Sequence, residues 1–275
     1  MDPQQARARA DAVMERHEAG ELEGALAEVR ALLADLELVD VTDEVLRESL
    51  FTARFEHAVL LTELGDLQAA ADAYGVAART PSDLDDPDQR HELALAALNQ
   101  GICLDALGER DAAVTVYAGL VARFGDADDP VTVDQVVRAR VNHAAALLAA
   151  QRPSEAAAVA REIRTSLAPD DVLSSEQHVM AARIEAAALC ALGRDAEAVA
   201  VLTDLDGVTR EDEATWLQLI AAAQEACEVL LEQDRRAEAA ALLDQVLDAD
   251  EPDPSPEVTA ALEELTALRA RLGAD

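Results

Sequence analysis

Residues 98–125 read LNQGICLDALGERDAAVTVYAGLVARFG, and this stretch decides the fold of the 275-residue chain. Apolar side chains recur at three- and four-residue steps on both sides of Gly108, which indicates one helix before the glycine and a second one after it. Glycine readily takes the left-handed backbone conformation that ends a helix. The stretch therefore predicts two antiparallel helices joined by a tight turn at Gly108.

The same pattern occurs six times along the chain, at spacings of 41 to 45 residues. The turn residues are Gly20, Gly65, Gly108, Gln151, Gly193 and Asp234. An alanine follows each of them by five residues, at Ala25, Ala70, Ala113, Ala156, Ala198 and Ala239. A helical hairpin that repeats at such a period cannot bury its apolar face alone and has to stack on its neighbours.

Helix-start signals separate the repeats. Asp86-Pro87 and Asp129-Pro130 each place a capping carboxylate before a proline that suits the first turn of a helix. They predict first helices of about 18–22 residues and second helices of about 12–16 residues. The segment EPDPS at 251–255 breaks the pattern. We therefore expect an all-α array of about six hairpins over residues 1–255, with a C-terminal capping helix in 256–275 of the same domain.

The hairpin resembles the tetratricopeptide repeat (TPR). Residues 98–125 are the best copy, and the resemblance covers nearly all of 6–249. That family repeats at about 34 residues, so this chain resembles a variant with longer helices. The resemblance implies a right-handed α-solenoid and a non-catalytic protein–protein interaction scaffold. A peptide or helix of a partner protein would then bind in the concave groove, which the first helix of each hairpin lines.

Three polar residues are candidates for contacting such a ligand. Asn99 and Asn142 stand nine residues before their turn residues in adjacent repeats, and Arg138 lies one helical turn from Asn142. The resemblance implies that asparagines at this place, with a nearby cation, clamp the terminal carboxylate of a peptide, which amide and guanidinium groups recognise through charge-assisted hydrogen bonds. The alternative is that the asparagines bond the backbone or neighbouring helices.

Four apolar residues are a second set of candidates, because their repeat positions are also expected to face the groove. They are Phe55, Leu98, Ile102 and Val141. If they are exposed, they would form a patch suited to an amphipathic helix or an extended peptide. The alternative is that they pack between neighbouring hairpins.

The sequence contains no arrangement typical of an enzyme or of a metal or cofactor site. His57 and His143 share one repeat position and are expected about two repeats apart, too far to bind one ion. No Ser/His/Asp or Cys/His arrangement is visible. We expect a non-enzymatic protein without a cofactor.

The charge limits the possible partners. The formal net charge is −34, and all 22 basic residues are arginine. Such a field repels phosphate backbones, which argues against direct nucleic-acid binding, and it would steer a basic or amphipathic protein segment towards the chain. No signal peptide and no membrane-spanning apolar run is visible, so we expect a cytoplasmic protein.

Three alternatives stay open at this point. An acidic array could imitate nucleic acid and occupy the basic cleft of a DNA-binding protein. It could also be a self-assembling scaffold, and the oligomeric state is not predictable from the sequence. Finally, a lysine-free, arginine- and alanine-rich composition is typical of GC-rich bacterial coding, and an acidic surface suits a salty cytoplasm, so the charge need not reflect a partner.

Overall fold

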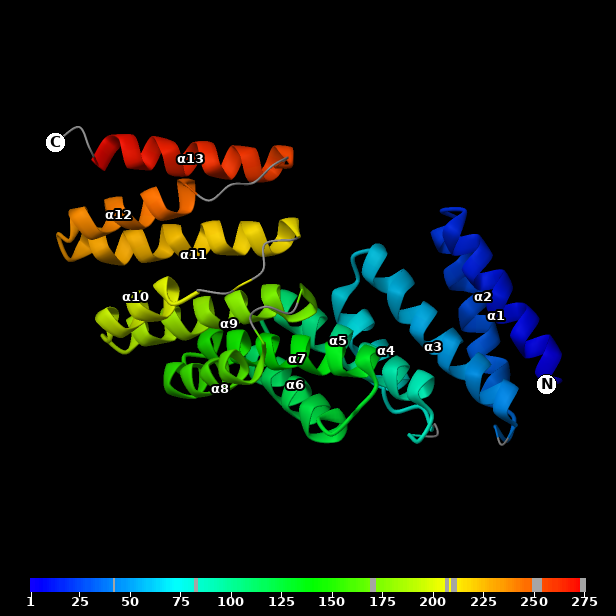
Figure 1. Cartoon of the computed structure of the whole chain (residues 1–275). Coiled ribbons are helices and arrows are strands. Elements are labelled where there is room, and N and C mark those ends of the chain that lie inside the picture. Colours follow the sequence, from blue (N-terminus) through cyan, green and yellow to red (C-terminus); the bar gives the residue numbers. More distant parts are fainter. Residues whose placement is uncertain are drawn as a thin grey trace. The chain divides into compact units, whose positions relative to one another are not determined.

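The computed structural model describes residues 1–41, 43–81, 84–168, 172–205, 208, 212–248 and 254–272, without the side chains of 172 and 173. In these ranges the chain forms thirteen helices and no strand (Figure 1). The first helices of the hairpins are α1 (Pro3–Glu18), α3 (Glu44–Glu63), α5 (Pro87–Ala106), α7 (Pro130–Ala149), α9 (Val172–Ala191) and α11 (Glu213–Glu232). The second helices are α2 (Leu22–Leu36), α4 (Leu67–Ala77), α6 (Arg110–Phe124), α8 (Pro153–Ser166), α10 (Asp195–Thr203) and α12 (Arg236–Leu247). The all-α prediction is confirmed.

The chain divides into two compact units, Met1–Ala146 and Leu147–Asp275, with the division inside α7. In the first unit, α3 packs on α1, α2 and α4, and α5 packs on α4 and α6. In the second unit, α9 packs on α8, α10 and α11, and α11 also packs on α10 and α12. A thirteenth helix, α13 (Pro256–Leu272), packs on α11 and α12. Residues 251–253 of the predicted break and 273–275 of the predicted last helix lie outside the described residues.

All six predicted turn residues adopt the left-handed conformation, with φ from 57° at Asp234 to 80° at Gly65. At Gly108, its own N–H donates to the Asp105 carbonyl at 2.9 Å, and the next N–H donates to the Leu104 carbonyl at 2.9 Å. These two bonds define a Schellman motif, which satisfies carbonyls that a helix end leaves free. The same pair of bonds closes each of the other five turns, including those at Gln151 and Asp234.

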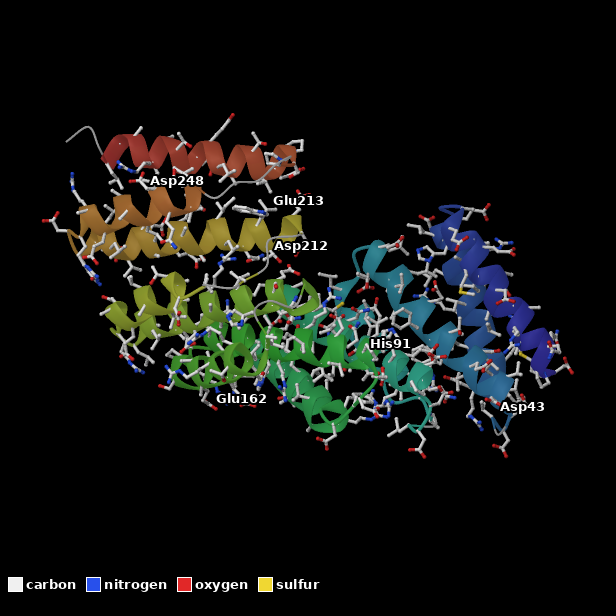
Figure 2. All side chains as sticks on the ribbon, in the orientation of Figure 1. Asp43, His91, Glu162, Asp212, Glu213 and Asp248 are labelled. Carbon is white, nitrogen blue, oxygen red and sulfur yellow. The ribbon has the colours of Figure 1, made fainter. Side chains whose placement is uncertain are left out.

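Helix lengths agree with the prediction for the first helices, since α3, α5, α7, α9 and α11 each have 20 residues. Aspartates cap the starts of α3, α7 and α11. Asp129 accepts from the Thr132 N–H at 2.7 Å, and Asp43 and Asp212, both labelled in Figure 2, cap α3 and α11 in the same way. The predicted second-helix length is wrong for α4, which has 11 residues, and for α10, which has 9.

Local sequence explains both short helices. Pro81 follows α4 closely, and a proline both lacks an N–H and disfavours helical backbone in the residue before it. In α10, the Thr203 hydroxyl donates to the Val199 carbonyl at 2.9 Å, and the next residue, Asp204, leaves the helical region. Threonine and aspartate compete for backbone hydrogen bonds and so weaken a helix end.

Each hairpin closes around small side chains. The alanine five residues after each turn is fully buried in all six hairpins. The leucine four residues before the turn is buried in the five hairpins that have it, at Leu61, Leu104, Leu147, Leu189 and Leu230. Small residues at fixed depth let the two helices of a hairpin approach closely, and the leucines fill the remaining space. None of the described helices combines the length and the apolar composition that a membrane span requires.

Candidate functional site

Asn99 on α5 is hydrogen-bonded to the hydroxyl of Tyr74, which belongs to the second helix of the preceding hairpin. Burial raises the pKa of Tyr74, and its bonds with Thr62 and Asn99 partly offset this effect. Asn99 therefore joins two neighbouring hairpins through a tyrosine that is mostly enclosed between them.

Asn142 on α7 makes the equivalent contact one repeat later. The Tyr117 hydroxyl donates to Asp105 Oδ2 at 2.9 Å, and its oxygen accepts from the Asn142 amide. Burial is the main cause that raises the pKa of Tyr117, and the neighbouring charge of Asp105 adds to it. In the same way, burial raises the pKa of Asp105, while the bond from Tyr117 acts against this shift.

The two asparagines thus have the kind of partner that the alternative interpretation describes, a side chain of a neighbouring helix. A carboxamide has two N–H donors and a carbonyl acceptor, so one bond to a tyrosine leaves hydrogen-bonding capacity at each asparagine. Arg138 has a half-exposed side chain, and its guanidinium lies 3.9 Å from Asp134 Oδ2, a loose contact within α7. Its donors remain accessible to a ligand.

The apolar candidates separate into buried and accessible residues. Leu98 and Val141 are 2% and 1% exposed, so they lie in the core and have no surface to offer a partner. The expectation of a four-residue patch is corrected for these two, because their side of each helix turns towards the neighbouring helices. Phe55 is half-buried and stacks on Phe51, with 5.7 Å between ring centroids. Ile102 is 45% exposed.

The sequence interpretation missed Glu92, a half-buried carboxylate on α5 that makes no ion pair within the described part of the chain. Burial, then the charges of Glu48, Asp88 and Asp86, raise the pKa of Glu92 to about 7. A signal did exist in the sequence. The residues sixteen before the other five turns are uncharged and polar, Gln4, Ser49, Gln135, Gln177 and Gln218.

His17 on α1 is a second unforeseen feature. Its Nδ1 lies 3.0 Å from Glu56 Oε2, and its Nε2 lies 2.9 Å from Glu63 Oε1, both on α3. The bond to Glu63 is the main cause that raises the pKa of His17, burial acts against it, and the bond to Glu56 adds to it. Because a carboxylate faces each ring nitrogen, the doubly protonated imidazolium is the form that fits this site.

In the second unit, arginine–glutamate ion pairs join helices that pack against each other. Glu185 on α9 is fully buried, and the guanidinium groups of Arg161 and Arg164 on α8 contact it at 2.7 and 3.1 Å. Arg183 on α9 bonds Glu225 on α11 at 2.6 Å. Over the ranges that the structure describes, no group of three His, Cys, Asp or Glu side chains is placed to hold a metal ion.

No family model matches the chain. No curated protein matches it. Among solved structures, the chain is similar to the TPR-like repeats of a Podospora anserina putative kinesin light chain, seen in two crystal structures. The TM-score is 0.54 in both, at 16% identity, over 76% and 77% of this chain and 96% and 99% of those chains. The chain has the TPR-like repeat fold.

A weaker likeness is to a Rap protein in complex with competence and sporulation factor, with a TM-score of 0.46 and 11% identity over 97% of this chain and 80% of that one. The TPR-like fold confirms the resemblance drawn from residues 98–125, and identities this low establish the fold alone.

Proposed function

We propose that this TPR-like chain is a non-catalytic interaction module that holds a basic or amphipathic segment of another protein on the first helices of its first unit. The observation that carries the proposal is Ile102, a large aliphatic side chain that is nearly half exposed on α5, one turn from Asn99. Exposed apolar side chains beside polar groups with free hydrogen-bonding capacity are typical of peptide-binding surfaces.

The charges on α5 favour a basic segment. Glu92 lies nearer the start of the same helix, close enough to Glu48 and Asp88 for their charges to raise its pKa. A lysine or arginine of a partner would offset this mutual repulsion between carboxylates. On α7, Arg138 and Asn142 present donors that suit a carboxylate of the same segment. The partner segment would thus carry an apolar anchor with basic residues on one side of it.

A site-specific photo-crosslinker tests the location. It is placed at Ile102 in one variant and at Val76 in a matched control. Val76 is also aliphatic, belongs to the same unit and is 43% exposed, but it lies on a second helix, α4. In native lysate we expect a protein captured at 102 and not at 76. A peptide copied from the captured segment should then bind at least about tenfold more weakly to Ile102→Glu and Arg138→Ala, a loss of about 1.4 kcal/mol.

Equal capture at both positions would contradict the proposal. Capture at both positions that moderate salt abolishes would favour the alternative, in which a basic nucleic-acid-binding protein covers the acidic surface, since only long-range charge attraction is screened so readily. Capture of a second copy of the chain would favour a self-assembling scaffold.

A further inference from the structure

A groove lies between the second helices α10 and α12 of the second unit. It has a volume of about 450 Å³. Its walls carry the exposed Ala196 and Ala200 of α10 and the exposed Ala241 of α12, and its floor includes Val199, Leu230 and Leu242. Thr203 and Gln245 line this groove and also a smaller hollow beside it. Trp216 is another lining residue of the hollow.

The lining residues show that α10 and α12 run in the same direction along the groove. Ala196, near the start of α10, shares it with Arg235, just before α12. Thr203, at the end of α10, shares the hollow with Val246, near the end of α12. The two helix N-termini therefore lie at one end of the groove and the two C-termini at the other, which gives the groove a positive and a negative end.

Aspartates strengthen the negative end. Asp204 is the residue at the C-terminus of α10. Asp248 holds the same place at the C-terminus of α12 and is labelled in Figure 2. Asp204 is highly exposed, and its ion pair with Arg164 is loose, at 3.9 Å. Asp248 has no ion pair among the described residues. A carboxylate at a helix C-terminus is unfavourable, and a cation there is favourable. At the other end, Arg235 makes a bidentate pair with Glu238, at 2.9 and 2.7 Å.

We propose that this groove binds an amphipathic helix of another protein, with a face of small and apolar residues and with lysine or arginine in its first turn. Small wall residues four apart, Ala196 and Ala200, admit the ridge of a helix rather than the flat side of a strand. The helix runs antiparallel to α10 and α12, because its positive N-terminus and its basic residues then meet Asp204 and Asp248. This site is independent of the first-helix surface on the other unit.

Trp216 supplies the readout. It is the single tryptophan of the chain, it is 3% exposed, and it lines the hollow at the negative end. The probe is a synthetic helical peptide of about 15 residues, which spans α12 at about 1.5 Å per residue. It has an alanine–leucine face, three arginines in the first turn and no tryptophan. A second peptide of identical composition carries the arginines in its last turn.

With the full chain, we expect the first peptide to change the Trp216 emission in a saturable way and to bind at least about fivefold more tightly than the second. Ala200→Gln and Ala241→Gln fill the groove from exposed positions and should weaken binding at least tenfold. Ala187→Gln, at an exposed position on α9 outside the groove, is the matched control and should bind as the wild type does. Circular dichroism checks that each variant stays folded.

Asp204→Asn combined with Asp248→Asn separates a binding role from a structural one. This variant should bind the first peptide several-fold more weakly, while its unfolding midpoint stays the same or rises, because an unfavourable charge has left each helix end. Three results would each overturn the proposal: no saturable change, equal binding by groove and control variants, or equal binding of the two peptides. Concentration-dependent self-association that Ala200→Gln abolishes would also overturn it, since the occupant would be a second copy.

Discussion

The ring of Tyr117 lies so close to the backbone of Gly101 that a Cβ added at 101 would stand 2.3 Å from Tyr117 Cε1. These residues belong to α5 and α6, the two helices of the hairpin that carries the best copy of the repeat. Seven residues before the turn residue, where Gly101 stands, the other hairpins have small residues or a valine, such as Ala58, Ala144 and Val13. In this hairpin the glycine leaves the space that the tyrosine ring fills.

Gly101→Ala should destabilise the chain by about 1–3 kcal/mol, because a methyl group has no room and the helices must separate. This loss exceeds the gain in helix propensity that alanine normally brings over glycine. Urea unfolding of the wild type, Gly101→Ala and Gly101→Ala/Tyr117→Leu measures it. The smaller side chain in the double variant should recover part of the loss, so the two substitutions should be strongly non-additive. Additive effects would show that the contact does not limit the packing.

Gln151→Gly should stabilise the chain by about 0.5–1 kcal/mol. Gln151 holds φ at 60°, a conformation that costs a side-chain-bearing residue about 1–2 kcal/mol and glycine almost nothing. The matched reverse change, Gly108→Gln, meets open space at Cβ but the same left-handed backbone, and it should destabilise by a similar amount. The urea midpoints measure both changes. Equal signs for the two substitutions would contradict the argument from backbone conformation.

His17 should stabilise the first unit in a pH-dependent way. Its pKa is raised in the folded state above the ordinary 6.5, so its contribution is complete below about pH 6.5 and is lost as the pH rises through the folded-state value. The difference in unfolding free energy between the wild type and His17→Gln should therefore be larger at about pH 5.5 than at pH 9. An NMR titration of His17 should give a lower pKa in Glu63→Gln. A difference that does not vary with pH would contradict the assignment.

The contribution of Glu92 to stability should also fall with rising pH, but because a charged form is disfavoured and not because a charged form is lost. Its pKa rises from about 4.5 to about 7 on folding, so folding disfavours the charged form and stability decreases as the pH rises between these values. Glu92→Gln removes this penalty, and we expect a higher urea midpoint at about pH 8 with little change at about pH 4.5. The exposed Glu162 on α8 provides a control, Glu162→Gln. An equal gain at both pH values would show that the effect is not ionisation of Glu92.

The residues at fixed distances from each turn were enough to predict the turns. Gln151 and Asp234 were identified as turn residues without being glycine, because buried residues at fixed distances on both sides define the register. The 20-residue lengths of α5 and α7 were predictable for a related reason, since Asp86 and Asp129 each stand before a proline at the helix start. The early ends of α4 and α10 were missed because the repeat spacing set the expected helix lengths, whereas Pro81 and Thr203 act locally, at one helix each.

The surface was less predictable than the turns. Leu98 and Asn99 are adjacent in sequence, yet one is in the core and the other bonds Tyr74, and a position rule borrowed from shorter helices assigned both to the groove. The Asn99–Tyr74 bond joins two hairpins, and repeat spacing alone does not give the rotation of one hairpin against the next. Glu92 could have been found by comparing the residues sixteen before each turn, because it is the single charged residue among them.

The helices that pack together within each unit are neighbours in chain order or are separated by one helix. No packed pair among these requires the closure of a long loop, so the entropy that opposes the first contacts is small. Folding can begin in whichever hairpin closes first and then spread to its neighbours. Backbone amides should accordingly exchange with deuterium in steps that follow hairpin boundaries, and a severe substitution in one hairpin should leave slow exchange in distant ones.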